Sequence, residues 1–290
     1  MRGQAVLFLA FVLAGPSARA AACCGPSASL PSLLTSGERW KLQGGLSQTT
    51  AIADVGTNGE AVFRRPGDRR SMSLMSLEVA GEIRESWQAG ITASRSPRDG
   101  RAGDLSLQVM HEALPETDGP RGLMRAFVFL QATFPTGRAL EELQSPEEDP
   151  TGEGRGSVAL GAVGIRRGWS DDQFVSARLR RFSSRVFSEG TGISSSWKAD
   201  LAAGTGRTWG AWRGGVSVRA EHEGARDVMS GGVPGQAAEN YRFPVGFSGS
   251  YFFKGGAMAQ LQYTDDTLLG PVRNILLGRG FALVFAQRFY

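Results

Sequence analysis

The residues best suited to acid–base chemistry are the two histidines, His111 and His222. A serine hydrolase needs a histidine base within reach of a serine, as in a Gly-x-Ser-x-Gly turn. The chain has no such turn, and no serine stands two residues after either histidine. His222 lies between Glu221 and Glu223, which leaves a hydrolytic site at the rim of the fold as an alternative. We predict that the protein is not an enzyme, because an exposed histidine of this kind is commoner than a catalytic one.

Arginine and glutamine side chains recur at every second position in several segments and suggest binding rather than catalysis. In an extended strand such residues share one face. If that face lines a narrow lumen, its cations attract anions by Coulomb forces. If the arginines pair with carboxylates instead, they fill the lumen and are structural. The predicted lumen-facing set comprises Arg178, Arg180, Arg213, Arg219, Glu78, Glu221, Gln260, Gln262 and Arg288.

The segment 135–155 is rich in carboxylates, which are the oxygen ligands that hard divalent cations prefer. The acidic residues there are Glu141, Glu142, Glu147, Glu148 and Asp149. Their spacing fits no calcium loop, so we predict a solvated surface loop and no metal site. The glycines of 151–154 and 204–206 belong to no strand–loop–helix unit that could hold a phosphate, and no cofactor is predicted.

The N-terminus has the features of a secretory signal: Arg2, an apolar stretch over 5–14, and the small-x-small sequence Ala18-Arg19-Ala20. We predict a signal peptide over 1–20, a periplasmic N-terminal segment over 21–38, and one β domain over 39–290. Cys23 and Cys24 are the only cysteines. Cys23 is a possible lipidation site, although the preceding alanines lack the usual leucine; a disulfide and a plain exposed tail are the other interpretations.

Composition favours a β protein. The chain has 40 glycines among 290 residues, and its apolar residues occur in short alternating runs. After the signal, no apolar stretch reaches the roughly 20 residues that a spanning helix needs. The net charge of +4 gives no general case for binding nucleic acid.

Runs with a two-residue period predict twelve antiparallel strands. The connections between them alternate between short and long, which is typical of a bacterial membrane barrel with short periplasmic turns and long extracellular loops. A soluble sandwich is the rival fold. The predicted strands cover 39–48, 71–83, 86–95, 103–113, 122–134, 156–166, 173–183, 197–206, 211–221, 241–252, 256–264 and 280–290.

Each predicted strand has one apolar row, and in a barrel these rows face lipid. The last strand shows the pattern well, with Phe281, Leu283, Phe285 and Phe289 on one side. Such a strand closes a barrel by pairing with the first, and we expect the barrel-assembly machinery to engage it. The predicted lipid-facing rows also include Met75, Leu77, Val79, Ile83, Ile91, Val128, Leu130, Phe134, Val175, Leu179 and Phe247.

Tryptophan positions give a second indication of a membrane. Aromatic rings gather at membrane interfaces because they combine an apolar body with a polar group. Only Trp197 maps to the long-loop end. The predicted interface aromatics at the short-turn end are Trp40, Trp87, Trp169, Trp209, Trp212 and Tyr290.

Two turn sequences and the terminal strand resemble those of outer-membrane transporters grouped with the phenol-degradation MetA-pathway protein. The matching pieces are Phe134-Pro-Thr-Gly137 at a strand end, Thr151-Gly-Glu-Gly154 before the next strand, and the segment 280–290. The resemblance covers about a tenth of the chain. It implies an outer-membrane barrel with a transport role, and it carries over no catalytic or ligand-binding residue.

These observations predict a monomeric, roughly twelve-stranded transmembrane β-barrel in the outer membrane of a Gram-negative bacterium. The expected function is a channel for small anionic or aromatic solutes. A plugged structural or surface-recognition barrel is the alternative, and a rim-site hydrolase a more distant one. The expected partners are outer-membrane lipid and lipopolysaccharide, the barrel-assembly machinery and small solutes, with no nucleic acid.

Overall fold

The computed structural model describes residues 33–34, 37–115, 124–139, 150–168, 170–187, 191–230, 233–270 and 272–290. The predictions for the signal peptide, for Cys23, for the acidic residues over 141–149 and for Trp169 lie outside these residues. Among the helices in the described ranges, none combines the length and the apolar character that crossing a membrane requires.

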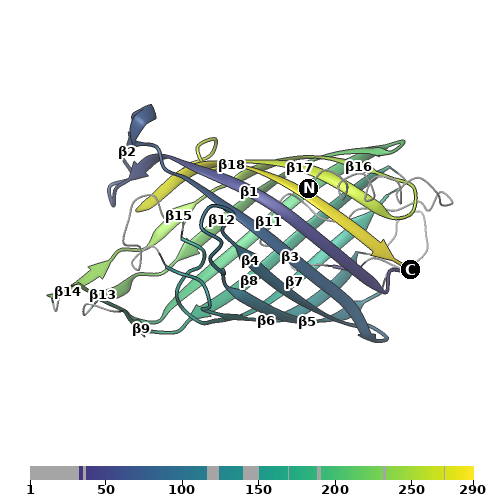
Figure 1. The fold of residues 1–290 in the computed structure, drawn as a ribbon, viewed down its shortest axis with the longest axis horizontal. Helices are drawn as coiled ribbons and strands as arrows, with labels where there is room; N and C mark the ends of the chain where they lie inside the picture. The colour runs from purple at the N-terminus through teal and green to yellow at the C-terminus, as the bar shows by residue number, and fades with distance from the viewer. Residues whose placement is uncertain are drawn as a thin grey trace.

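Twelve antiparallel strands form a closed barrel, so the predicted fold class is confirmed (Figure 1). The order around the wall is β11-β8-β7-β6-β5-β4-β3-β1-β18-β17-β16-β12, and β12 pairs with β11 to complete the cylinder. The wall strands are β1 (Trp40–Val55), β3 (Ser71–Arg84), β4 (Trp87–Arg95), β5 (Leu105–Leu114), β6 (Arg125–Phe134), β7 (Ser157–Arg167), β8 (Asp171–Phe182), β11 (Ser196–Trp209), β12 (Trp212–Glu223), β16 (Val245–Phe252) with its continuation β15 (Asn240–Arg242), β17 (Ala257–Asp265) and β18 (Ile275–Phe289).

The first and last strands close the barrel, as the terminal aromatic pattern predicted. β1 pairs with β18 from Trp40 opposite Phe289 to Val55 opposite Ile275. Both strands extend further toward the long loops than the sequence indicated, because their pairing continues past a bulge near Ala51. The soluble sandwich is therefore excluded, since closure leaves the sheet without free edges.

One wall strand is interrupted where the sequence places a proline. β12 pairs with β16 up to Val218 opposite Val245, and then with β15 from Glu221 opposite Arg242. Pro244 has no N–H to donate, so it lies between the two segments, and its carbonyl oxygen accepts a hydrogen bond from Arg219 N at 2.9 Å. Beyond this break, Arg242 of β15 again turns its side chain toward the lumen.

The two ends of the barrel differ as predicted. Short connections join β3 to β4, β7 to β8 and β11 to β12, and the C-terminus lies at this short-turn end (Figure 1). The long loops at the other end carry the small strands β2 (Ala61–Phe63), β9 (Arg185–Val186), β10 (Gly192–Ile193), β13 (Arg226–Ser230) and β14 (Val233–Ala237), with the short helix η1 (Pro66–Asp68). The last four of these strands form a separate sheet.

The outer surface of the barrel is apolar along the predicted rows. Leu77 is 54 % exposed, Leu130 53 % and Phe285 56 %. In water these side chains would make an unusually large apolar surface, whereas lipid accommodates them. Trp40, Trp87, Trp209, Trp212 and Tyr290 are exposed at the short-turn end, and Trp197 is exposed at the long-loop end. Five of these six aromatic residues therefore lie at the short-turn end of the barrel.

The short-turn half of the interior is packed with side chains. Leu33 joins an apolar cluster inside the wall that consists of Met110, Phe127, Phe129, Val163, Ile165 and Phe174. Next to it, Leu34 N donates to Gln88 Oε1 at 3.0 Å, and Gln88 Nε2 donates to Leu34 O at 3.3 Å. A piece of the chain that precedes the barrel therefore lies within the barrel, across its short-turn half.

Glycines in the wall give the rings of this cluster their space. A Cβ atom at Gly161 would lie 2.4 Å from Phe129 Cζ and 2.6 Å from Ala177 O. A Cβ atom at Gly204 would lie 2.3 Å from Phe174 Cε1. The two rings therefore lie directly over glycine backbone, which lets two large residues fit side by side in a narrow bore.

Gly161→Ala is expected to destabilise the barrel by about 1–3 kcal/mol, the usual cost of overpacking a filled core. Gly249→Ala is the matched control, because a methyl group there would meet nothing within 4 Å. The measurement is the midpoint temperature at which the folded form disappears from gels of heat-treated protein. Equal midpoints for the two variants would show that the interior is loosely packed.

Candidate functional site

A cavity of about 500 Å³ occupies the long-loop half of the lumen, and we call it the vestibule. Its volume lies within the roughly 300–1,000 Å³ range of small-molecule sites. Nearly every wall strand contributes an inward side chain near its long-loop end. The polar lining residues are Ser47, Thr49, Glu78, Thr92, Asp104, Ser106, Gln108, Gln131, Thr133, Glu153, Arg178, Arg180, Lys198, Arg219, Glu221, Arg242, Gln262, Thr264 and Asp266.

Among the described residues, the cations that line the vestibule all stand on one side. They belong to four strands that are neighbours in the wall, β8, β11, β12 and β15. We call this side the cationic wall, and its members are Arg178, Arg180, Lys198, Arg219 and Arg242. The facing side, from β1 through β6, offers mainly hydroxyl and amide groups, with Glu78 as its strand carboxylate. The lumen is thus electrically asymmetric across its width.

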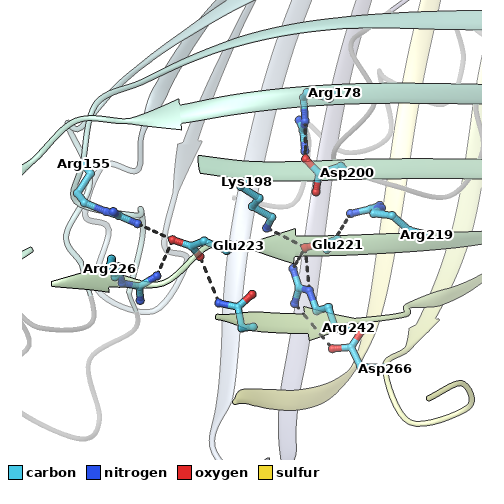
Figure 2. A network of polar contacts seen from close by, with 11 residues as sticks. Arg155, Arg178, Lys198, Asp200, Arg219, Glu221, Glu223, Arg226, Arg242 and Asp266 are labelled. Atoms are coloured by element: carbon cyan, nitrogen blue, oxygen red, sulfur yellow. Dashed lines mark hydrogen bonds and ion pairs between the residues drawn. The ribbon is translucent and has the colours of Figure 1, made fainter. Parts of the chain in front are cut away.

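Glu221 is the centre of the cationic wall. Figure 2 shows three cations converging on it: Lys198 Nζ at 2.7 Å, Arg219 Nη1 at 2.9 Å and Arg242 Nη2 at 2.7 Å. The carboxylate is 3 % exposed, and a buried charge of this kind is tolerated only when it is paired and hydrogen-bonded. Glu221 therefore orders three long side chains that would otherwise repel each other.

Two further carboxylates compensate part of the remaining charge. Arg178 Nη2 lies 2.8 Å from Asp200 Oδ2, and Arg242 Nη1 lies 3.9 Å from Asp266 Oδ2. Five cations against Asp200, Glu221 and Asp266 leave 5 − 3 = +2 on this side of the vestibule. Glu78 on the opposite wall and Asp104 and Glu153 at the mouth are the other charges that the described residues present to the cavity. With them, six carboxylates stand against five cations, so the excess of +2 is local to the cationic wall.

The carboxylate of Glu223 is the centre of a second cluster of polar contacts, nearer the mouth. Glu223 Oε1 accepts from Arg155 Nη2 at 3.2 Å and from Ser196 Oγ at 2.9 Å, and Glu223 Oε2 accepts from Asn240 Nδ2 at 3.3 Å. Arg226 also pairs with Glu223 (Figure 2). These contacts tie the ends of β11, β12 and β15 to the long loops, so they fix the mouth of the vestibule.

The two turn sequences behind the transporter resemblance contact each other at this rim. Arg138 N donates to Thr151 Oγ1 at 2.9 Å, and Thr136 Oγ1 donates to Gly103 O at 2.6 Å. Asp104 joins the two turns, since its carboxylate accepts from Gly137 N at 3.0 Å and from Glu153 N at 2.9 Å. The turns therefore hold Asp104 and Glu153 at the mouth of the vestibule.

Asp104 was not among the residues that the sequence singled out. Burial raises the pKa of its carboxyl group above the ordinary value, while the backbone N–H groups of Glu153 and Gly137 act in the opposite direction. Gly152 is required beside it, because a Cβ atom there would lie 2.2 Å from Asp104 Oδ1. The available sequence signal was an acid at a strand start within a glycine-containing turn.

The predicted lumen set divides into two groups in the structure. Arg178, Arg180, Arg219, Glu78, Glu221 and Gln262 line the vestibule. Arg213, Gln260 and Arg288 also turn away from lipid, but they are buried outside the vestibule lining. Arg213 Nε bonds Asp172 Oδ2 at 2.8 Å, and Arg288 Nη1 lies 3.0 Å from Glu38 Oε1. Lys198, Arg242 and Asp200 were not in the predicted set.

The histidines lie away from the vestibule. His222 follows Glu221 in a strand and so faces the opposite side, where its ring stacks on Tyr241 with centroids 4.4 Å apart. Its Nε2 lies 3.5 Å from Glu239 Oε2. His111 stacks on Trp87 near the short-turn end. The structure therefore does not bring His222 together with Glu221 and Glu223 as the hydrolytic alternative required.

Comparison with known proteins identifies the fold. No protein-family model matches the sequence, and no curated protein does. Among solved structures, an outer membrane channel from Pseudomonas putida F1 is similar, with a TM-score of 0.65 and 15 % identity over 93 % of this chain and 100 % of that one. The NanC porin matches with a TM-score of 0.48 and 8 % identity over 87 % and 100 %. The first of these structures confirms the predicted resemblance to outer-membrane barrels at the level of the fold.

Proposed function

We propose that this protein is a channel of the Gram-negative outer membrane that admits small polar solutes and prefers anions. The observation that carries the proposal is the cationic wall, which faces a vestibule inside a barrel with a lipid-compatible exterior. Cations inside a low-dielectric cylinder raise the local concentration of anions. The fold of a known outer membrane channel, shared over almost the whole chain, supports a transport role.

The lining favours polar solutes over aromatic ones. Hydroxyl, amide and charged groups surround the vestibule. The one aromatic residue among its described lining residues, Phe281, belongs to the lipid-facing row and is 58 % exposed. A site for aromatic solutes needs apolar or aromatic walls. We therefore place aromatic solutes second to anions, and we assign no catalytic role to the chain.

A plugged barrel with a structural or recognition role is the second candidate. The packed short-turn half favours it, because Leu33 and Leu34 lie across the path from the vestibule to the other end. A smaller cavity of about 150 Å³, lined by residues that include Glu38, Glu82 and Arg125, lies beyond this layer. In the channel proposal this layer is the barrier that limits flux.

Efflux from proteoliposomes distinguishes the candidates. Vesicles are loaded with labelled gluconate, sorbitol or protonated glucosamine, which are similar in size and differ in charge. We expect gluconate to leave fastest and glucosamine slowest, because the excess of +2 on the cationic wall attracts the first and repels the second. Release no faster than from protein-free vesicles, for all three compounds, would support the plugged barrel instead.

The expected partners follow from the proposed location. The apolar rows would contact outer-membrane lipid, and the long-loop end would face lipopolysaccharide. The strand β18 would be the segment that the barrel-assembly machinery engages, because it completes the wall by pairing with β1.

A further inference from the structure

Within the cationic wall, Arg180 differs from its neighbours in forming no ion pair with a carboxylate of the described residues. In the described residues, Arg178 has Asp200, and Lys198, Arg219 and Arg242 share Glu221. Arg180 has no ion pair or hydrogen bond there, and its Nε atom is shielded from solvent without an acceptor. Its Cζ atom lies 5.7 Å from the centroid of the Phe182 ring, and the carboxylates of Asp200, Glu153 and Glu221 attract it only from beyond ion-pair distance.

The neighbours of Arg180 make this isolation unfavourable. Arg178 lies two residues away on the same face of β8. On β11, Lys198 is the direct cross-strand partner of Arg180. Like charges directly opposite each other in a sheet repel, and a buried donor without an acceptor costs further free energy. Lys198 turns its ammonium group toward Glu221, so the charge of Lys198 is paired while that of Arg180 is not. An anion supplied from the vestibule would satisfy both requirements.

The vestibule also offers hydrogen-bonding groups to the rest of an organic anion. Arg180 lines the same cavity as Ser106, Thr133 and Gln131, which belong to β5 and β6. Ser106 and Thr133 are hydrogen-bonded to each other at 3.0 Å, so their hydroxyl groups are held in place. A guanidinium group binds a carboxylate with two parallel hydrogen bonds, while hydroxyl and amide groups bind the hydroxyl groups of a solute.

We infer that Arg180 is the anchor of a binding site for small hydroxylated carboxylates, in which the carboxylate binds Arg180 and the hydroxyl groups face the Ser106 and Thr133 side. The inference rests on the proposed channel function, because the vestibule supplies the solute. The charge of the cationic wall alone would enrich all anions in the vestibule, whereas the inferred site would bind one class of anion saturably. Chloride can neutralise Arg180, but it cannot accept two parallel hydrogen bonds from the guanidinium group as a carboxylate does. It also has no hydroxyl groups to bind Ser106 and Thr133.

Calorimetric titration of the purified full barrel in detergent tests the site, with sodium gluconate as the probe and sorbitol as its uncharged counterpart. We expect saturable binding of gluconate and none of sorbitol. Arg180→Gln should weaken gluconate binding by at least about tenfold, the usual effect of losing a hydrogen-bonded charge. Arg180→Lys keeps the charge without the planar fork, so its affinity should fall between the two.

The matched control is Arg181→Gln. Arg181 is the next residue of β8, faces lipid and lies over the Trp197 ring at 5.1 Å. Gluconate affinity should be unchanged in this variant. Because Arg180 forms no ion pair or hydrogen bond with the described residues, Arg180→Gln should also leave the unfolding temperature no lower than in the unchanged protein, whereas an arginine held in an ion pair would lower it.

The outcomes separate this inference from the proposed function. If gluconate does not bind, if sorbitol binds equally well, or if Arg180→Gln binds as tightly as the unchanged protein, the site is overturned. Should solutes nevertheless leave proteoliposomes, the channel stands without a carboxylate site. Should gluconate bind at Arg180 while no solute crosses, the site stands and the channel proposal fails.

Discussion

Replacing Leu33 and Leu34 by asparagine is expected to raise the single-channel conductance severalfold. Both side chains are buried inside the barrel, with exposures of 2 % and 1 %. Burying two leucines contributes about 3–6 kcal/mol, and each 1.4 kcal/mol or so is a tenfold change in an equilibrium. These contacts therefore hold the segment in the lumen almost all of the time. Amide side chains would lose this contribution and bring polar groups into the apolar cluster around Met110.

Planar-bilayer recordings at fixed salt measure this effect. The control variant is Val62→Asn with Phe63→Asn, which changes two exposed apolar residues of β2 at the long-loop end, far from the packed half. Its conductance should equal that of the unchanged protein. A conductance that does not rise on replacing Leu33 and Leu34 would mean that another layer limits the path, and the ion pairs of Arg213 and Arg288 would be the next candidates.

Reversing the charge of the cationic wall is expected to reverse ion selectivity. Lys198→Glu changes the excess on this wall from +2 to 0, and adding Arg180→Glu changes it to −2. The lumen should then pass from anion preference through little preference to cation preference, because the sign of the wall charge determines which ion is enriched. Glu221 keeps Arg219 and Arg242 as partners in both variants.

The single variant should fold well, since its new carboxylate would stand directly opposite Arg180 in the register of β8 and β11. Reversal potentials across a KCl gradient provide the measurement. Arg207→Glu, on β11 near the short-turn end and outside the vestibule lining, serves as the control for total charge. If Arg207→Glu shifted the reversal potential as much as Lys198→Glu, selectivity would follow net charge rather than the vestibule, because both variants change the total charge by the same amount.

The wall of the barrel was predictable from sequence because its two faces meet different solvents. Rows such as Met75 and Leu77 alternate with polar residues such as Glu78, and the two-residue period appears directly in the sequence. Val175 was also predicted to face lipid, and the structure places it outside, with its neighbour Phe174 inside. Parity could equally have shown that His222 faces away from Glu221.

The site was less predictable because it depends on register between strands. Arg178 meets Asp200 only because β8 and β11 pair in one register, and Glu221 collects Lys198 and Arg242 from two different neighbours. Nothing in the local pattern of any single strand specifies these pairings. The docking of Leu33 was out of reach for a related reason: the segment before β1 has no periodicity, and its partners come from β5 to β8.

In this proposal the lumen conducts ions and the cationic wall selects them. The most direct test of the proposal is the reversal potential of the unchanged barrel, reconstituted in a planar bilayer with tenfold different KCl concentrations on the two sides. We predict discrete current steps whose reversal potential has the sign of chloride preference. A reversal potential with the sign of potassium preference would contradict the account, and so would the absence of current even after Leu33 and Leu34 are replaced.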